Sequence, residues 1–174
     1  IRQDKPRNPG KYSNKVIPIT YKILTSDGQF LQPKKTLVLD RKTSSIKLKN
    51  QHEKPTISLL NSFSAPVLVE FEQPIDDLLS ILEFETDFTS VWMAKKNLDY
   101  LVLEKIALND KSGAEHVISR IYEIIIKKLD TKLLLSKLLE LPRDDEYFSK
   151  LLEKCNTADP NIIQKNLLEY SAIY

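Results

Sequence analysis

One stretch of the sequence begins like a metal site: residues His52 to Thr56, HEKPT. The zinc-binding signature H-E-x-x-H needs a second His four residues after the first, because one helical turn brings both imidazoles to the same ion. The fifth residue here is Thr56. Pro55 lacks an amide proton and disfavours helical backbone at Lys54, so no helix is expected to run through the stretch. The pattern therefore predicts a turn that enters a strand, and no metal site.

No other set of side chains combines a nucleophile with a base. His116 lies beside Glu115 in an expected helix without a third group to orient it, which favours a solvated or structural role. Cys155, the single cysteine, is expected near a helix end, where the dipole disfavours the thiolate. The consecutive carboxylates Asp144, Asp145 and Glu146 are typical of the start of a helix, where negative charge complements the helix dipole. One Cys and two distant His cannot build a zinc cluster, and 3 Gly provide no phosphate loop. We predict no catalytic, cofactor-binding or metal-binding residue, and an inactive chain.

Composition excludes two classes of partner. The chain has 174 residues, with Lys+Arg 26 against Asp+Glu 24, a formal charge of +2 that is too balanced to attract nucleic acid. No apolar run reaches the roughly 18 residues of a membrane span, so no membrane partner is expected. The N-terminal residues contain no apolar segment of a signal peptide, although the sequence starts at Ile1 and not at Met. The single cysteine favours a reducing compartment, and a cytoplasmic location is expected.

The first part of the sequence has the pattern of short β-strands. Val16–Leu24 alternates apolar and polar side chains and is rich in β-branched and aromatic residues, as in a half-buried strand. Ser26–Gln29 contains Asp-Gly, whose glycine tolerates the positive φ of a hairpin turn, and Phe30 begins the return. Similar runs follow at Thr36–Leu39, Ser45–Leu48, Ile57–Leu60 and Val67–Phe71. Short strands at this spacing predict a β-sandwich.

From Pro74 onwards the apolar period becomes that of α-helices. Pro74 suits a first helical turn, and Asp76 with Asp77 complements the positive end of the helix dipole. Ser112 followed by Glu115 indicates a capping box. The expected helices are one from Pro74 with Leu82 on its apolar face, Thr89–Leu108, Ala114–Leu129, Thr131–Leu141, Asp144–Cys155, and a last one with Asp159 as its cap and Pro160 in its first turn.

Two domains follow from this change of period. We predict a β-sandwich over residues 1–73 and an all-α, antiparallel, solenoid-like region over residues 74–174. Trp92, the only tryptophan, falls on an apolar helical face, and core or interdomain packing is expected for it.

Four segments, in order, resemble one enzyme family. Lys54–Val67 resembles K-P-x-P-S-L-L-R-G-F-S-A-P-V of the bacterial-type aminopeptidase N family, the zinc-dependent alanyl aminopeptidases, and Glu85–Trp92 resembles its D-S-D-x-F-N-R-W. Pro6–Gly10 followed by Ile17–Ile19 is similar to its T-P-P-T-P-G and H-I-P-L, and Asp159–Ile163 to its D-P-D-A-I-H. The agreement covers nearly the whole chain.

The resemblance implies that this chain is the non-catalytic part of a larger peptidase. In that family an upstream catalytic domain carries the zinc site, a small immunoglobulin-like sandwich follows, and a helical domain closes the active site. The chain would then be the sandwich, entered partway at Ile1 with early strands missing, plus the first helices. The implied partners are the catalytic domain of the same polypeptide and, for the parent, peptide substrates. Zinc is implied for the parent and no cofactor for this chain.

The sequence also departs from the family. Asn61-Ser62 replaces R-G, so a turn with positive φ at Ser62 would be strained, unless Asn61 takes that conformation instead. We expect a structural motif next to it: Phe63 filling the sandwich core, Ser64, and the extended pair Ala65-Pro66 leading into the last strand. That strand leads directly to the first helix, so a rigid junction between the sheet and the helices is expected.

An alternative function from another class is an independent interaction module. A sandwich that lacks its early strands would expose a sheet edge, which favours dimerisation or docking of a partner protein through that edge or through a helical face.

Overall fold

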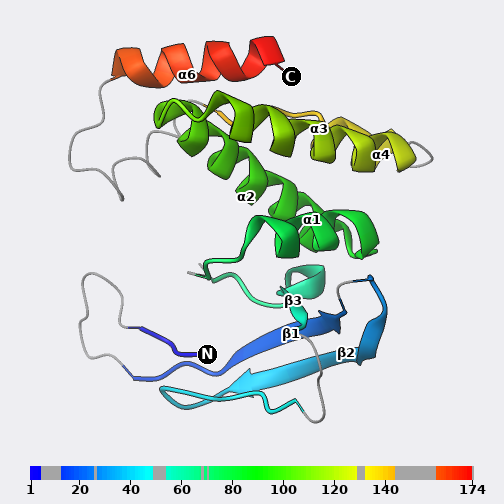
Figure 1. Ribbon diagram of the computed structural model, residues 1–174. Helices are drawn as coiled ribbons and strands as arrows, with labels where there is room; N and C mark the ends of the chain where they lie inside the picture. The colour runs from blue at the N-terminus through cyan, green and yellow to red at the C-terminus, as the bar shows by residue number, and fades with distance from the viewer. Residues whose placement is uncertain are drawn as a thin grey trace.

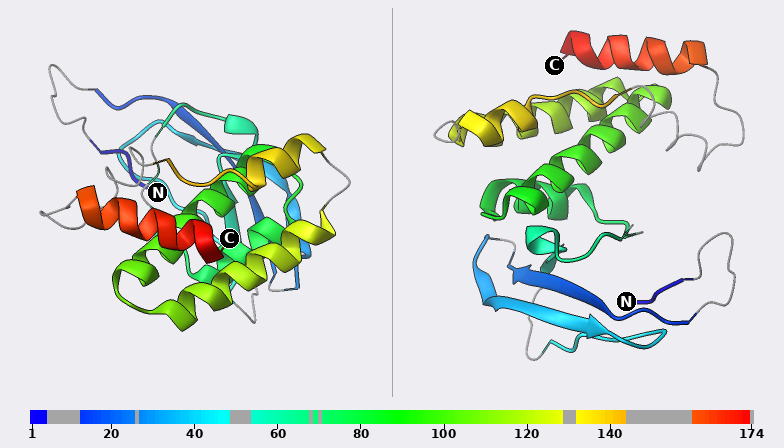
Figure 2. Two further views of the ribbon diagram at one scale, coloured as in Figure 1. Left: turned by 90° about the horizontal axis from the view of Figure 1, so that it is seen from above. Right: turned by 180° about the vertical axis from the view of Figure 1, so that it is seen from behind.

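The computed structural model describes residues 1–4, 13–25, 27–48, 54–67, 69, 71–128, 132–143 and 160–173. It consists of a small sheet at one end and a stack of helices at the other, with the edge strand β3 and the short helix η1 on the side of the sheet that faces the helices (Figure 1). The view from behind shows the same separation (Figure 2, right). In that view and in Figure 1, α6 lies on the side of the helical stack away from the sheet. The predicted order of β-structure followed by α-structure is confirmed.

The sheet has three antiparallel strands in the order β2-β1-β3. β1 is Ile17–Leu24, β2 is Phe30–Leu39 and β3 is Thr56–Leu59. The predicted Asp-Gly turn joins β1 to β2, and Gly28 has a φ of 83°, which glycine adopts without strain. The runs predicted at Phe30 and at Thr36–Leu39 form one strand, with irregular pairing opposite residues 21 to 24 of β1.

Two predicted strands are wrong where the structure describes them. Residues 45–48 form no strand. The chain just before them pairs with the N-terminal residues: the Gln3 amide donates to Lys42 O and the Ser44 amide to Ile1 O. Residues 67, 69 and 71 also lie outside any strand. The amide of Val67 donates to Ala65 O at 3.0 Å, so a tight turn uses the group that a strand would need for pairing.

The described helices follow the predicted positions closely. They are α1 Ile75–Phe84, α2 Phe88–Ala107, α3 Lys111–Lys127, α4 Lys132–Leu138 and α6 Pro160–Ile173. The predicted helix Asp144–Cys155 and the cap Asp159 lie outside the described residues. The capping box at Ser112 is wrong: α3 begins at Lys111, and Asp110 caps it by accepting the Gly113 amide at 3.0 Å.

The described core has two parts. The larger cluster lies among the helices, and its fully buried members include Leu82, Leu98, Val102 and Ile121. The smaller cluster lies against the sheet and contains Ile19, Leu39, Leu60 and Ala65. Trp92 is half-buried and is not among the residues of either cluster.

Candidate functional site at the junction of the sheet and the helices

Two of the segments singled out in the sequence meet where the sheet joins the helices. Ser62, in η1 (Asn61–Phe63), donates from its backbone amide to Asp87 Oδ2 at 2.8 Å and from its hydroxyl to the same oxygen at 2.9 Å. Asp87 directly precedes α2. The segments Lys54–Val67 and Glu85–Trp92 are therefore in direct contact through these bonds. We call Lys22, Asn61, Ser62, Glu85, Asp87 and Ser90 the junction cluster.

Asp87 uses its second oxygen to begin α2. Oδ1 accepts the backbone amide of Ser90 at 3.1 Å and the Ser90 hydroxyl at 3.1 Å, which satisfies an amide that has no partner within the helix. Burial raises the pKa of Asp87, but the hydrogen bonds from Ser62 and Ser90 more than offset it, so the pKa lies below its ordinary value. The ionised carboxylate holds the turn and the helix start together.

The turn that Asp87 holds has an unfavourable backbone. Leu60, Ser62 and Phe63 have φ values of 55°, 57° and 50°, in the left-handed region that side chains with a Cβ adopt rarely. Asn61 does not take this conformation, so the strain expected at Ser62 is present there. A strained segment persists only where its surroundings hold it, and here the two hydrogen bonds from Ser62 to Asp87 supply that restraint.

Glu85 is the second centre of the cluster. Its side chain is fully buried, and Oε1 accepts Lys22 Nζ at 2.5 Å, the Thr86 amide at 2.7 Å and the Asp87 amide at 3.0 Å. Burial raises the pKa of Glu85, yet hydrogen bonds from Lys22 and from the two amides more than offset this and leave the pKa below its ordinary value. Lys22 belongs to β1, so this ion pair joins the sheet to the end of α1.

Asn61 occupies the centre of the contact and is fully buried. Its Nδ2 lies 2.9 Å from Ser58 Oγ, 2.7 Å from Ser90 Oγ and 3.2 Å from Glu85 Oε2. An ionised carboxylate only accepts hydrogen bonds, so Glu85 fixes the amide with its NH₂ group inward. Asn61 Oδ1 is left buried without a hydrogen-bond partner, and the cluster is therefore polar but not fully satisfied.

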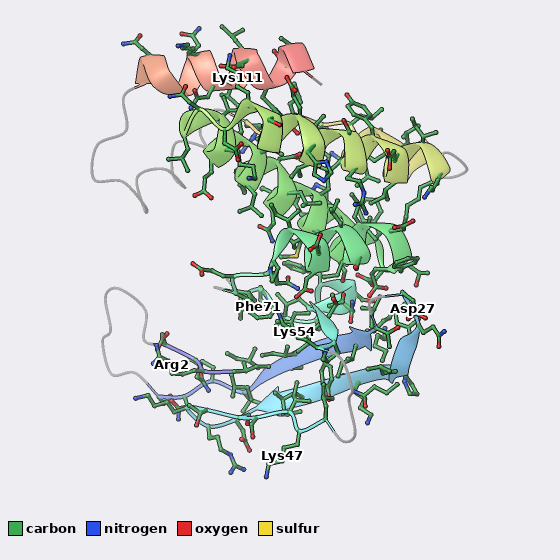
Figure 3. The ribbon with its side chains drawn as sticks, viewed as in Figure 1. Arg2, Asp27, Lys47, Lys54, Phe71 and Lys111 are labelled. Carbon is green, nitrogen blue, oxygen red and sulfur yellow. The ribbon has the colours of Figure 1, made fainter. Side chains whose placement is uncertain are left out.

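Further contacts flank the cluster. Asp77 of α1 accepts the Thr56 hydroxyl at 3.0 Å and pairs with Lys54 at 3.5 Å, and Gln73 Nε2 donates to Ile57 O at 3.0 Å. In Figure 3, Lys54 and Phe71 lie between the sheet and the helices, and Asp27 lies at the tip of the hairpin.

The tip of the hairpin also packs against α1. A Cβ added at Gly28 would lie 2.2 Å from Cγ of Phe84, so the ring occupies the space that glycine leaves free. Together with the contacts of Asp77 and Gln73, this packing joins the sheet and the helices at several points.

The predicted structural motif is only partly where it was expected. Phe63 is 60% exposed, so the expectation that it fills the sandwich core is wrong. The left-handed backbone at Ser62 and Phe63 turns the chain there, and Leu60 and Ala65 are buried instead, at 1% and 3% exposure.

Ser64 and Pro66 lie on either side of Ala65. Ser64 Oγ accepts the amide of Thr20 at 2.9 Å, which fixes the motif to β1, and Pro66 is exposed.

The cluster has no arrangement for bond-breaking chemistry. Its two carboxylates are saturated with donors, and no group of three or more His, Cys, Asp or Glu side chains suited to a metal occurs within the described ranges. His116 is exposed on α3, whereas His52, Glu53 and Cys155 lie outside the described residues. Lys54 and Thr56, two of the three described residues of HEKPT, both contact Asp77. What the cluster can do is to fix the orientation of the helices relative to the sheet.

Sequence reasoning found the two segments but not the roles of their side chains. Asp87 directly before a helical apolar pattern is a recognisable N-cap signal. Lys22 carried no such signal, because its partner Glu85 is 63 residues away. None of the helices in the described part of the chain is long and apolar enough to cross a membrane.

The chain was compared with known proteins. Residues 1–72 match the family model of a domain of unknown function with an Ig-like fold, DUF3458. Among solved structures, the chain is similar to aminopeptidase A of Legionella pneumophila, crystallised in complex with aspartic acid: the TM-score is 0.69 and the sequence identity 25%. This likeness covers 88% of the present chain but only 18% of the Legionella chain. None of the curated proteins searched matches.

Proposed function

We propose that this chain is a non-catalytic portion of a zinc aminopeptidase of the aminopeptidase N type, which removes N-terminal residues from peptides. The observation that carries the proposal is the similarity to the Legionella aminopeptidase over 88% of the chain. The two segments that resemble the family most specifically, Lys54–Val67 and Glu85–Trp92, also contact each other in this chain.

The role proposed for the chain is that of a rigid spacer. The division proposed is a sandwich domain over residues 1–73 and a helical domain over residues 74–174, supported by the family match that ends at residue 72 and by α1, which begins at Ile75. A catalytic domain of the same polypeptide would be the partner, and the junction cluster would set the orientation of the helices toward it. A cytoplasmic location is part of the proposal.

Zinc belongs to the proposed parent and not to this chain. The described residues offer no set of three ligands for it, so no step of catalysis is assigned to them. The chain would set the orientation of the helices, and the catalytic domain would supply the chemistry.

The test is to capture the native gene product with an antibody raised against this chain. The captured protein is expected to contain zinc, to cleave an alanyl reporter and to lose that activity with a zinc chelator. A native product that contains no zinc and cleaves no aminoacyl reporter would refute the parent assignment.

The second candidate, an interaction module, is favoured by the exposure of β2. This strand lies at the edge of the sheet and most of its side chains are exposed, including the apolar Phe30, Leu31 and Val38. Unpaired edges accept strands from other molecules. Sedimentation of the 174-residue chain over a range of concentrations distinguishes the two: a dimer supports edge pairing, and a strict monomer argues against it.

A further inference from the structure

A small pocket lies where β3, the segment that leads into α1, and the helices α1 and α2 meet. Its floor consists of buried apolar side chains from the end of β3 and from both helices: Leu60, Leu78, Ile81 and Ala94. Its volume is about 60 Å³, which is space for one small aliphatic group. The pocket adjoins the junction cluster, because Ser90 belongs to both.

Two large apolar side chains lie at the mouth of this pocket. Val69 and Phe71 line it and are 40% and 45% exposed. Phe71 is labelled between the sheet and the helices in Figure 3. Met93 of α2, which is half-buried, adds a flexible thioether to the lining. Exposed apolar side chains around an apolar floor favour a ligand that removes them from water.

The described residues that line the pocket include no charged side chain, although charged residues make up 29% of the chain. The Ser90 hydroxyl donates to the carboxylate of Asp87 at 3.1 Å, so negative charge lies just beyond the lining and disfavours an anion. That carboxylate already accepts four hydrogen bonds, from Ser62 and Ser90, and has no acceptor position left for a cation. An ion would therefore leave water without compensation, and the pocket suits a neutral ligand.

Two side-chain amides with unused hydrogen-bonding capacity also line the pocket. Asn97 is half-buried, and its amide makes no hydrogen bond to any residue that the structure describes. Gln73 donates from Nε2 to Ile57 O at 3.0 Å, and its Oε1 has no partner in the described part of the chain. A side-chain amide carries both donor and acceptor, as a peptide unit does, so it can exchange two hydrogen bonds with a peptide backbone.

A peptide that uses these groups must be extended. In a helix the backbone N–H and C=O groups bond to each other, whereas an extended segment offers them to its binding partner. The apolar floor then takes one side chain of the segment, and the amides take the backbone beside it.

We propose that this pocket, the Met93 pocket, binds an apolar side chain of a neutral, extended peptide segment of another protein, with the Asn97 amide paired to the peptide backbone beside that side chain. The proposal goes beyond the spacer role, because it rests on the residues of the pocket and not on the likeness to a peptidase. Either proposal can fail without the other.

Met93 is the only methionine, so an isotopic label in its methyl group gives a single NMR signal that reports on the pocket. The 174-residue chain is titrated with N-acetyl-leucine N′-methylamide, a neutral compound whose apolar side chain lies between peptide groups. The Met93 signal is expected to shift saturably, and the melting temperature to rise. The absence of a saturable shift would overturn the proposal.

Three analogues test the parts of the ligand. N-acetylglycine N′-methylamide lacks the side chain, N-acetyl-leucine carries a carboxylate, and isoamyl alcohol has the apolar group without peptide groups. Each should bind at least roughly tenfold more weakly, because each loses apolar burial, neutrality or the amide hydrogen bonds. Equally tight binding of any of the three would overturn the proposal.

Asn97→Ala tests the amide. The variant should raise the Kd for the leucine compound by roughly tenfold, the effect of losing hydrogen bonds to the backbone of the ligand. Its melting temperature without ligand should equal that of the unchanged chain, because the amide has no partner in the described structure. The matched control is Asn14→Ala, an exposed asparagine before β1, which should leave the Kd unchanged. An equal rise in Kd in the control would overturn the location.

Phe71→Ala tests the apolar mouth and keeps the test open if Asn97→Ala folds poorly. It should raise the Kd by roughly threefold or more through lost apolar contact. Its control is Phe30→Ala, a similarly exposed phenylalanine on β2, which should have no effect. Finally, the Met93 signal is recorded without ligand over a range of protein concentrations. A shift with protein concentration alone would identify a second copy of the chain as the occupant and overturn the proposal.

Discussion

One oxygen of Asp87 accepts both the backbone amide and the hydroxyl of Ser62, at 2.8 and 2.9 Å, while Ser62 has a left-handed backbone. The other oxygen of Asp87 begins α2. A single carboxylate thus restrains a strained turn on the sheet side and caps the longest described helix. This relationship makes the junction testable residue by residue.

Asp87→Ala should destabilise the chain by about 2 to 4 kcal/mol. The variant loses an N-cap, which contributes about 1 kcal/mol, and the charged hydrogen bonds to Ser62, which contribute the rest. Urea unfolding measures the change. The control is Asp40→Ala, an exposed carboxylate paired only with the neighbouring Arg41 in the described structure, which should change stability by less than about 0.5 kcal/mol. Equal effects of the two substitutions would show that Asp87 does not hold the junction.

Ser62→Gly and Ser62→Ala separate strain from hydrogen bonding. Both variants lose the hydroxyl bond to Asp87, but only glycine adopts a φ of 57° without cost. The glycine variant should be more stable than the alanine variant by about 1 kcal/mol, the reverse of their usual order. If alanine is the more stable of the two in urea, the left-handed turn is not strained as described.

Gly28→Ala tests the packing of the hairpin on α1. The new methyl would meet the Phe84 ring at a backbone φ of 83°, so a loss of more than about 1 kcal/mol is expected. The double variant with Phe84→Ala should lose less than the sum of the two single losses, because the ring that clashes is gone. Additive losses in thermal or urea unfolding would mean that Gly28 and Phe84 do not interact.

Stability should fall in acid. Glu85 and Asp87 both have a pKa that folding lowers, so the unfolded chain binds more protons and stability rises with pH in the acidic range. Their contribution is complete above their unfolded pKa values of about 4.3 and 3.9, and is lost as pH falls through the lower folded values. Unfolding free energies measured from pH 6 to pH 3 should show this loss, and Glu85→Gln should reduce the slope. An unchanged slope in that variant would remove Glu85 from the effect.

The fold could be predicted from the sequence where signals are local. The change of apolar period at Pro74 located the start of the helices, and Asp-Gly located the hairpin. The strand predicted at residues 45–48 fails because pairing depends on distant residues, here Ile1 to Gln3. The side of the chain on which Phe63 emerges depends on left-handed backbone angles, which the residue types at this position do not indicate.

The junction cluster could be predicted from the sequence only in part, for the same reason. Its segments were visible as a resemblance, but Lys22, Asn61 and Glu85 meet across 24 to 63 residues of sequence. Contacts between residues so far apart produce no periodic pattern in the sequence. The cap at Asp110 was missed for a different reason: Asp and Ser are equally good caps, and the sequence contains both within three residues.

The central claim is that this chain is a non-catalytic part of a larger peptidase. The measurement that tests it most directly is the size of the native gene product, by immunoblot of source-cell lysate with an antibody against the chain. The account predicts a band several times larger than 20.1 kDa. A single band at 20.1 kDa would contradict it and identify a free-standing module without the catalytic domain.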